Sequence, residues 1–335
     1  MTNYITGPTG YAVSLQGPYY ETDASMRIYF VPADRSKLEA TLDRYVNVGS
    51  SNTTYKPLGN RVVACFTNIL EVRAGDTKLG YMHEIDVAFF IPALGYWGPS
   101  PIPTSVAFFA PYLFVNNPWA MATGREVHGF RKDMAVRYHP TLDVNSAAWT
   151  NKPGDLTQVV AWAIQAKGNN SKMVPIELAT VIPPSAVPAS VPWDIDDIIA
   201  EAIGDGPTIV EPGGQVPDDL GIGLRMVFAK AIEKIASAIL AGLNLSVAIH
   251  VPLVFLRQFR DPFDSSLADV QQIIEADALA GIPNGVKLPG AYQLKFHNTA
   301  SHPIADELGM PNDTPVNASL TLELSAFNFT LNHAS

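Results

Sequence analysis

Long runs of β-branched and aromatic residues, separated by turn-forming residues, dominate the first half of the chain. Such residues fit a pleated, half-buried surface, so each run predicts a strand. Gly59-Asn60 and Asn116-Asn117-Pro118 are examples of the turn signals between them. The sequence therefore predicts a β-rich fold. The runs span residues 27–31, 62–72, 84–91 and 106–115.

Shorter segments complete the expected architecture. Asp34 can cap a helix over 34–45, because Leu38, Leu42 and Tyr45 recur at helical spacing. Strands and helices do not alternate along the chain, so an antiparallel α+β fold is favoured over a doubly wound parallel sheet. Further strands are expected at 155–165, 172–181, 245–256, 291–297 and 316–331, and a further helix at 268–278.

Residues 185–243 differ in character from the segments on either side. The segment begins in a proline-rich stretch, becomes acidic and helix-like, and passes through a Gly/Pro-rich loop before a second helical pattern. We expect a single domain over 1–335 with 185–243 as a helical insertion. The insertion could serve as a lid, as an oligomer contact or as neither.

Composition narrows the class of protein. The chain has 335 residues, of which 47% are hydrophobic and 16% charged, so it can bury a large core. A formal net charge of −10 argues against a nucleic-acid partner, because phosphate binding needs clustered Lys and Arg. A cationic substrate stays compatible with this charge. The one cysteine, Cys65, lies in an apolar run and is expected to be a small core residue.

Two segments bear on targeting and on membrane insertion. The segment Met1-Thr2-Asn3-Tyr4 lacks a basic stretch followed by an apolar one, so we expect no secretory signal and a cytoplasmic protein. Residues 235–256 carry no formal charge and are long enough to span a bilayer. Gly242 and Pro252 interrupt this stretch, so we expect a helix ending near Gly242, then a buried strand, and no membrane partner.

One polar segment carries the strongest chemical signal. Gly124-Arg125-Glu126 precedes Lys132, which lies between the apolar residues Phe130 and Met134. Desolvation disfavours an ammonium group and lowers its pKa, by up to ~3–5 units at full burial. A lysine shifted in this way can attack a carbonyl carbon and form an imine. On spacing alone, a lysine whose amine reaches solvent is the favoured reading, because most lysines extend to water.

These residues resemble a known family. Gly124-Arg125-Glu126 followed by Gly129-Phe130-Arg131-Lys132 is similar to the Gly-Arg-Glu…Gly-Phe-Pro-Lys-Lys signature of acetoacetate decarboxylase and its relatives. The resemblance covers most of the chain, because weaker matches follow in the family's order. They are Gly17-Pro18-Tyr19, Ala33-Asp34, Gly80-Tyr81-Met82-His83-Glu84, residues 256–261 and residues 292–296.

The resemblance implies a fold and a chemistry. It implies a cone-shaped antiparallel β-barrel with helices packed outside, a buried pocket, a small-molecule carbonyl substrate and a homo-oligomer. It also implies imine chemistry without metal or cofactor, in which Lys132 is the nucleophile and Glu84 a proton-transfer group. In the family, the lysine condenses with a β-keto acid, the protonated imine accepts electrons as CO2 leaves, and hydrolysis releases the ketone.

The chain departs from the family pattern at several positions. Asp133 replaces the second lysine of the pair, and a carboxylate there would favour a charged Lys132 if the two side chains met. Adjacent residues in an extended segment point apart, which would keep them separate. Arg131 replaces the family proline. A pocket arginine is expected near Ala24, with Arg27 the nearest candidate, and a second pocket glutamate falls near Asn68 or Ile69.

Supporting roles are expected for the neighbours of Lys132. Arg125 and Glu126 could form a buried ion pair that holds the lysine strand. If the segment is extended, His128 shares a face with Glu126 and Lys132, as a pocket acid or base or as a structural histidine. Phe130 supplies apolar surroundings. His83 would face away from Glu84, and no His, Cys or carboxylate cluster has metal-ligand spacing.

Three functions remain open on the sequence. The first is a carbon–carbon lyase that decarboxylates a keto acid or related carbonyl compound through an imine on Lys132. The second keeps the imine but uses it for aldol, retro-aldol or dehydration chemistry, which loss of the carboxylate-binding arginine would favour. The third is a non-catalytic barrel that binds an apolar small molecule.

Overall fold

The computed structural model describes residues 14–48, 51–75, 80–101, 103–139, 157–168, 170–185, 190–192, 201, 248–281, 284–288 and 290–331. These residues form many strands and few helices, as the sequence predicts. The elements are β1 (Tyr19–Pro32), α1 (Arg35–Tyr45), β2 (Thr53–Pro57), β3 (Arg61–Ala74), β4 (Met82–Trp97), β5 (Ser105–Val115), α2 (Pro118–Thr123), η2 (Gly124–His128), β6 (Lys132–His139), β7 (Thr157–Ile164), β8 (Met173–Ile182), β9 (Val191–Pro192), β10 (Ala248–Arg260), β11 (Ala268–Gly281), β12 (Asn284–Lys287), β13 (Gln293–Phe296), α5 (Ile304–Leu308), β14 (Val316–Asn317) and β15 (Leu320–Leu331).

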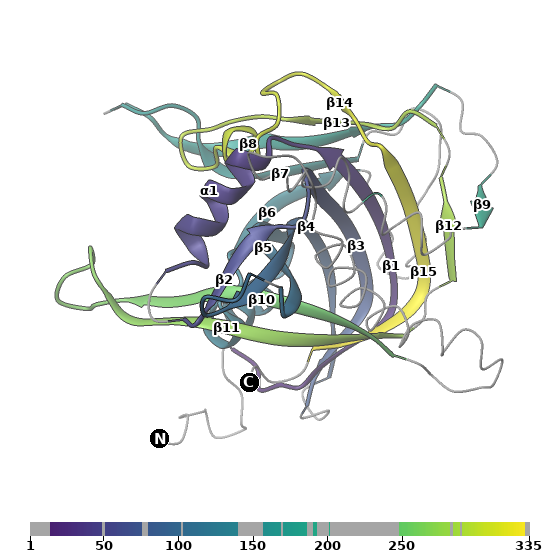
Figure 1. Ribbon diagram of the computed structural model, residues 1–335. Helices are drawn as coiled ribbons and strands as arrows, with labels where there is room; N and C mark the ends of the chain where they lie inside the picture. The colour runs from purple at the N-terminus through teal and green to yellow at the C-terminus, as the bar shows by residue number, and fades with distance from the viewer. Residues whose placement is uncertain are drawn as a thin grey trace, which may run out of the picture.

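The described strands join in one large, curved sheet (Figure 1). Neighbouring strands are antiparallel except where β5 meets β6 and β10. Strands β1, β3, β4 and β15 cross the middle of the view, whereas β7, β8, β13 and β14 lie at its top. The order of paired strands is β14-β13-β8-β7-β6-β5-β10-β11-β15-β1-β3-β4-β2, with β4 also pairing with β5.

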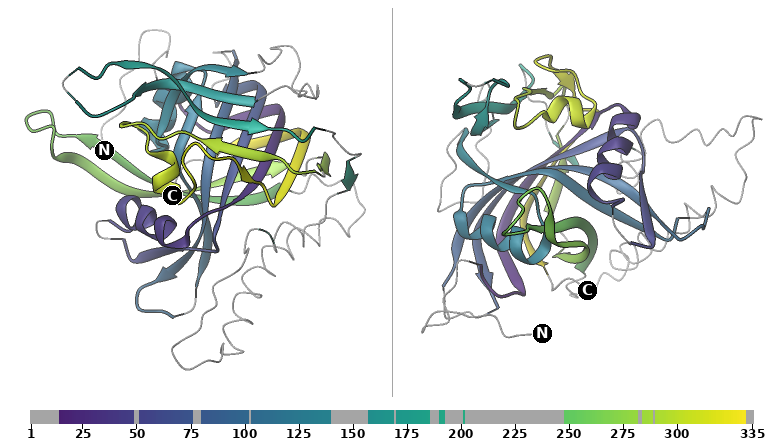
Figure 2. Two further views of the ribbon diagram at one scale, coloured as in Figure 1. Left: turned by 90° about the horizontal axis from the view of Figure 1, so that it is seen from above. Right: turned by 90° about the vertical axis from the view of Figure 1, so that its left-hand side faces the viewer.

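Whether this sheet closes into a barrel depends on the pairing between β5 and β10, which is its shortest. Strand β5 pairs with β4 along most of its length, but it meets β10 through a single residue pair, Phe108 and Leu253. Figure 2 shows the curvature of the strands from two further sides. An antiparallel, β-rich architecture is therefore confirmed, whereas a closed cone-shaped barrel stays a prediction.

Helix α1 begins where the sequence predicts. The Asp34 carboxylate accepts a hydrogen bond from the backbone N–H of Ser36 at 2.8 Å, which satisfies a free donor of the first turn. Leu38 and Leu42 are fully buried on the inner side of the helix. The helix packs against α5, β2 and β5, so its apolar face covers one part of the sheet.

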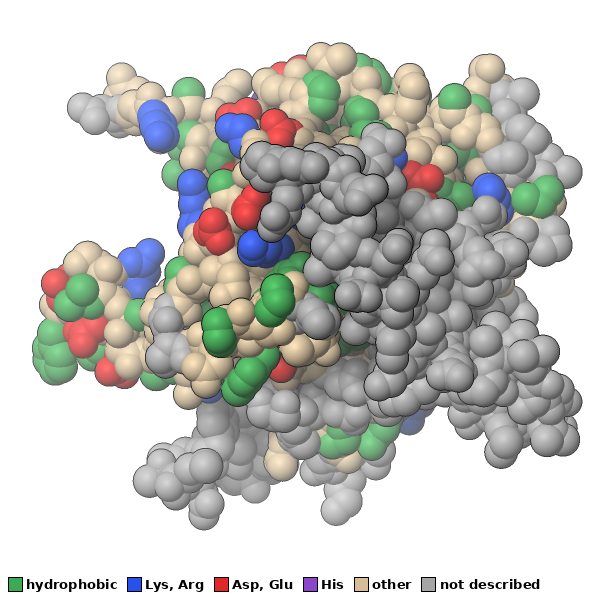
Figure 3. All heavy atoms as spheres, in the orientation of Figure 1, with side chains coloured by type: hydrophobic (Ala, Val, Ile, Leu, Met, Phe, Trp, Pro, Cys, Tyr) green, Lys and Arg blue, Asp and Glu red, His purple; other side chains and the backbone are tan. Residues whose placement is uncertain are grey.

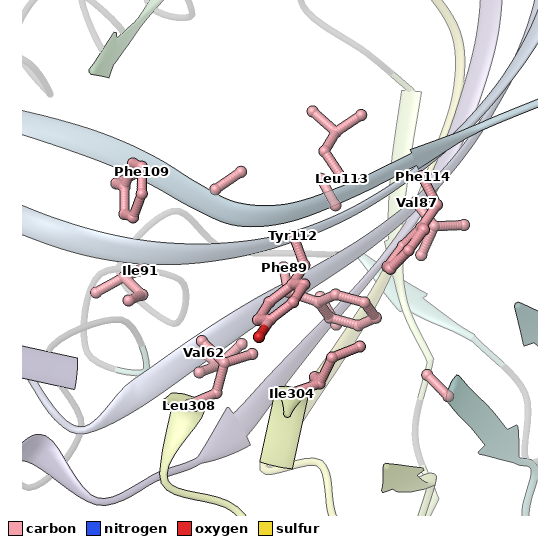
Figure 4. Close-up of a cluster of buried hydrophobic side chains, with 14 of the residues drawn as sticks. Val62, Val87, Phe89, Ile91, Phe109, Tyr112, Leu113, Phe114, Ile304 and Leu308 are labelled. Atoms are coloured by element: carbon pink, nitrogen blue, oxygen red, sulfur yellow. The ribbon is translucent and has the colours of Figure 1, made fainter. Parts of the chain in front are cut away.

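A large aromatic and aliphatic core lies between the sheet and α5 (Figure 4). Ile304 and Leu308 of α5 are fully buried against the side chains of β4 and β5. The rings of Phe89 and Phe114 meet edge to face, with centroids 6.5 Å apart. Each such large side chain contributes about 1.5–3 kcal/mol through burial. Cys65 is buried, as expected, and burial raises the pKa of its thiol.

The expected helix over 268–278 is wrong, because these residues belong to β11. The segment contains both helical and alternating spacings of apolar residues, and antiparallel pairing with β10 along its whole length decides between them. The hairpin of β10 and β11 projects from the body of the molecule (Figure 1), and Phe263 and Leu267, which lie between the two strands, are exposed. Figure 3 shows hydrophobic and acidic side chains together on this projection. The other predicted strands are confirmed, several of them longer than expected, except that the segment predicted as one strand over 316–331 forms two, β14 and β15.

The expected insertion, 185–243, lies outside the described residues except for 185, 190–192 and 201. Within the described part, β9 pairs with β12, and Glu201 forms an ion pair with Arg61 of β3 at 2.9 Å. The single-domain expectation over 1–335 therefore stays a prediction. Among the residues described, no helix is both long enough and apolar enough to span a bilayer.

Candidate active site

Sheet register brings Lys132 next to the acidic residues of β4. Lys132 begins β6 and is the partner of Leu113 in β5, which in turn is the partner of Ala88 in β4. Side chains of register partners lie on the same face, and so do residues two apart in one strand. Glu84 and Asp86 therefore share a face with Ala88 and Lys132.

The polypeptide reaches Lys132 through a short helical passage. The Asn117 side chain caps α2 by accepting hydrogen bonds from the backbone N–H groups of Trp119 and Ala120. The chain continues through the π-helical turn η2 and reverses at Gly129, whose φ is +76°. A Cβ at Gly129 would lie 2.5 Å from the backbone of Arg257, so this position accommodates only glycine.

The amine of Lys132 is buried and paired. Its Nζ donates a hydrogen bond to Oε1 of Glu84 at 2.8 Å, and the two side chains are only 9% and 4% exposed. Gly124 allows the aliphatic part of the lysine to pass, because a Cβ there would lie 2.7 Å from Lys132 Cδ. Phe130 covers another side, with its ring centre 5.5 Å from Nζ.

Two further carboxyl groups act on the same amine. Burial first, and then the charge of Glu84, raise the pKa of Glu21 in β1 to about 8. Burial raises the pKa of Asp86 to about 7, while the charge of Lys132 opposes that rise. Both residues keep some accessible surface, unlike Glu84. The site is therefore one ammonium group facing three carboxyl groups.

The pKa of Lys132 is raised, so the expected lowering is wrong. Burial is the largest influence and by itself lowers the pKa, but the charges of Glu84, Asp86 and Glu21 together with the Glu84 hydrogen bond outweigh it. The apolar neighbours expected from the sequence are present, yet the carboxyl groups contributed by β1 and β4 decide the direction of the pKa shift. At neutral pH Lys132 is therefore an ammonium ion.

Asp133 is adjacent to Lys132 in sequence but is not among the charges that raise the pKa of Lys132. Its carboxylate contacts Nε2 of His302 at 3.1 Å and accepts a hydrogen bond from the backbone N–H of Met134. Although burial opposes the change, these hydrogen bonds and the nearby charges lower the pKa of Asp133. The expectation that adjacent side chains point apart is confirmed.

The residues before Lys132 are arranged differently from the expectation. Because residues 124–128 form a π-helical turn rather than a strand, Glu126, His128 and Lys132 do not share a strand face. His128 is buried, stacks on Phe130 with ring centres 5.2 Å apart and meets the ring of Tyr19 edge-on. The ring of Phe130 thus neighbours both the His128 ring and the Lys132 amine.

The expected buried ion pair of Arg125 and Glu126 is also wrong. The side chain of Arg125 is exposed and that of Glu126 only half-buried. The backbone carbonyl of Glu126 accepts a hydrogen bond from Nε of Arg257, which attaches the turn to β10. The support of the lysine segment therefore comes from a backbone contact.

The candidate pocket arginine belongs to another part of the sheet. Arg27 is buried and forms an ion pair with Glu323 of β15 at 2.9 Å. Neighbouring Met26 is on the opposite face of β1, packed with the small cluster that contains Cys65. Asn68 contacts His83 at 2.7 Å, which confirms that His83 faces away from Glu84. Ile69 is the register partner of Glu84.

Sequence reasoning missed Glu21 and Asp86. Asp86 follows Glu84 by two residues inside a predicted strand, so alternation alone places both on one face. Glu21 follows Gly17-Pro18-Tyr19 and precedes the predicted start of the first strand at 27, whereas β1 begins at Tyr19. Within the described part of the chain, no group of three or more His, Cys, Asp or Glu side chains is arranged to hold a metal ion.

Comparisons with known proteins agree on the architecture. No protein-family model matches the chain, and no curated protein sequence matches it. Solved structures do match over nearly the whole chain. An acetoacetate decarboxylase from Legionella pneumophila is 13% identical with a TM-score of 0.57, and the match covers 99% of this chain and 91% of that one.

Two further structures match over a similar extent. An acetoacetate decarboxylase-like enzyme from Sphingomonas wittichii RW1 is 13% identical with a TM-score of 0.53, covering 100% of this chain and 98% of that one. The enduracididine biosynthesis enzyme MppR is 12% identical with a TM-score of 0.53, covering 98% and 91%. The resemblance found in the sequence is thereby confirmed for the fold: the chain has the fold of acetoacetate decarboxylase and similar enzymes.

Proposed function

We propose that this protein is a Schiff-base-forming carbon–carbon lyase in which Lys132 bonds to the carbonyl carbon of its substrate. One observation carries the proposal. The position that the acetoacetate decarboxylase signature assigns to the nucleophile holds a buried amine, 2.8 Å from the carboxylate of Glu84. The solved enzymes with the same fold support an enzymatic role.

The pairing with Glu84 sets the first step. An ammonium ion has no free electron pair, so Lys132 must first transfer a proton, and Glu84 is within reach to accept it. The neutral amine then adds to the carbonyl carbon. The resulting hydroxyl group leaves as water with the proton held by Glu84, and a protonated imine remains on Lys132.

Decarboxylation is the first candidate for the step that follows. The electron pair of the bond to the carboxylate carbon moves into the protonated imine, CO2 leaves and an enamine forms. Protonation of the enamine carbon and hydrolysis release the ketone and restore the lysine. The resemblance and the acetoacetate decarboxylase structures support this route.

Retro-aldol or dehydration chemistry is the second candidate, and the acidic groups favour it. Glu21 and Asp86 have pKa values of about 8 and 7, which suit proton transfer to and from a hydroxyl group near neutral pH. Arg27, the nearest candidate to bind a substrate carboxylate, is paired with Glu323. A structure of MppR holds the condensation product of pyruvate and imidazole 4-carboxaldehyde.

A purely apolar-binding barrel is the weakest of the three readings. Removing two charges from water costs several kcal/mol per ion before their mutual attraction is counted. An apolar ligand would gain nothing from Lys132 and Glu84 at the site, whereas imine formation uses both. The buried pair therefore supports chemistry over simple apolar binding.

Reductive trapping tests the proposal. The full-length protein is incubated with acetoacetate, pyruvate or simple aldehydes in the presence of borohydride, and modified peptides are identified by mass spectrometry. We expect modification of Lys132, its loss in Lys132→Ala, and no loss in Lys172→Ala, where the replaced lysine is exposed just before β8. CO2 release then separates decarboxylation from aldol-type chemistry. The absence of any adduct on Lys132 with every compound would overturn the proposal.

A further inference from the structure

One amine and three carboxyl groups meet around Lys132. Glu84 accepts a hydrogen bond from the amine. Asp86 lies on the same face of β4, two residues further on, and Glu21 is the register partner of Val72, which is the partner of Met82, two residues before Glu84. Glu21 and Asp86 also act electrostatically on Lys132. One cation therefore faces three carboxyl groups from two strands that β3 separates.

Two candidate arginines, Arg27 in β1 and Arg131 next to Lys132, are engaged with other groups. Arg27 forms an ion pair with Glu323. Its side chain lies on the opposite face of β1 from its neighbour Met26. Arg131 donates to the carbonyl of Pro111 and covers the ring of Tyr45 at 3.9 Å. Asp133 occupies the place where the resemblance has a second lysine. No second cation from these residues reaches Glu21 and Asp86.

A positive charge on the substrate would act both on the two carboxyl groups and on the Lys132 amine. Burial and the charge of Glu84 raise the pKa values of Glu21 and Asp86 to about 8 and about 7, so near neutral pH each carboxyl group is protonated for much of the time. An entering positive charge would let both ionise. The same positive charge would repel the ammonium form of Lys132 and make its proton easier to lose. A substrate cation could thus supply the activation that a neighbouring lysine supplies in the related signature.

We propose that the Lys132 site takes carbonyl compounds that carry a positive charge near the carbonyl group, and that Glu21 and Asp86 bind this charge. The inference rests on the proposed imine chemistry and adds the substrate class to it. On binding, Glu21 and Asp86 release protons to solvent, and Lys132 passes one proton to Glu84. The nitrogen–carbon bond forms, the carbonyl oxygen takes one proton from the amine and the other from Glu84, and it leaves as water, giving a protonated imine.

Two aldehydes of the same shape test this inference. Betaine aldehyde carries a trimethylammonium group, and 3,3-dimethylbutanal has a neutral carbon in place of its nitrogen. Each is trapped with borohydride on the full-length protein, and labelling of Lys132 is divided by labelling of exposed Lys172 to remove the intrinsic reactivity of the aldehyde. We expect a normalised preference of at least about tenfold for the cation, the effect of about 1.4 kcal/mol of charge pairing.

Matched variants assign the preference to the acidic groups. Glu21→Gln and Asp86→Asn should each reduce the preference for the cation. Glu71→Gln, which removes a carboxylate that pairs with Arg73 in β3, should retain it. Two independent variants keep the test valid if one of them folds poorly.

The outcomes separate the inference from the function on which it rests. Equal normalised labelling of Lys132 by both aldehydes, or a preference unchanged in both acidic-site variants, would overturn the inference and leave imine chemistry standing. Failure of both aldehydes and of the keto compounds to label Lys132 would overturn the proposed function itself.

Discussion

The Nζ atom of Lys132 and the Oε1 atom of Glu84 lie 2.8 Å apart, although the two residues are 48 positions apart in the chain. They come from β6 and β4, which are joined through β5. Removing one partner of a buried pair leaves the other charge without compensation, which costs about 3–5 kcal/mol. The same contact thus serves the stability of the fold and the chemistry proposed for the site.

Stability and chemistry can be separated with a paired substitution. We expect Lys132→Met to lower the melting temperature, because Glu84 is left buried and unpaired. The double variant Lys132→Met with Glu84→Gln should regain most of that stability without regaining any borohydride-trapped adduct. Thermal melts and peptide mapping give the two readouts. Equal melting temperatures for the single and double variants would contradict a stabilising pair.

Two glycines next to the site should respond differently to alanine. Gly124→Ala places a Cβ 2.7 Å from Lys132 Cδ, so we expect a displaced lysine side chain and trapping reduced by about tenfold or more, with a modest loss of stability. Gly129→Ala places a Cβ 2.5 Å from the Arg257 backbone at a φ of +76°, so we expect a larger fall in melting temperature. Equal melting temperatures for the two variants would contradict this geometry.

The raised pKa of Glu21 predicts a pH-dependent stability. The unfolded chain releases this proton near pH 4.5 and the native state near pH 8, so the native state loses stability as the pH rises between these values. Glu21→Gln stays neutral at every pH. Its melting temperature should match the wild type near pH 4.5 and exceed it near pH 8, where each kcal/mol corresponds to roughly 2–4 °C.

A control on α1 completes that experiment. Glu39 is exposed on the helix surface, so Glu39→Gln should change the melting temperature little at either pH. A Glu21→Gln variant that shows no greater gain at pH 8 than at pH 4.5 would show that the native carboxyl group is ionised in the ordinary range.

Restoring a lysine at position 133 should not restore the family's activation. The Asp133 side chain faces His302 and not the amine of Lys132. We therefore expect Asp133→Lys to leave the rate of trapping at Lys132 unchanged or lower, and to remove the contact with His302. Measurement of the trapping rate against pH decides this, and a midpoint moved to lower pH in Asp133→Lys would contradict the observed side-chain direction.

Local patterns predicted most of the strands well. Alternation and turn residues located β3, β4 and β5, and the capping residue Asp34 located the start of α1. The helix expected over 268–278 failed because pairing with β10 is a long-range property that a short window does not contain. The resemblance to acetoacetate decarboxylase predicted the fold from the order of weak motifs.

The electrostatics of the site could not be predicted from the residues adjacent to Lys132. Phe130 and Met134 suggested a desolvated amine with a low pKa. Glu21 and Asp86 are far away in sequence, and only the register of β1, β3 and β4 shows that they lie near Lys132 and reverse the shift. Asp133, adjacent in sequence, faces His302 instead.

A crystal structure of the protein after borohydride reduction with a labelling aldehyde would test the central claim most directly. The account predicts continuous electron density from the Nζ atom of Lys132 to the ligand carbon, with the former contact to Glu84 rearranged. An unmodified Lys132 still paired with Glu84, with ligand density only at other lysines, would contradict it.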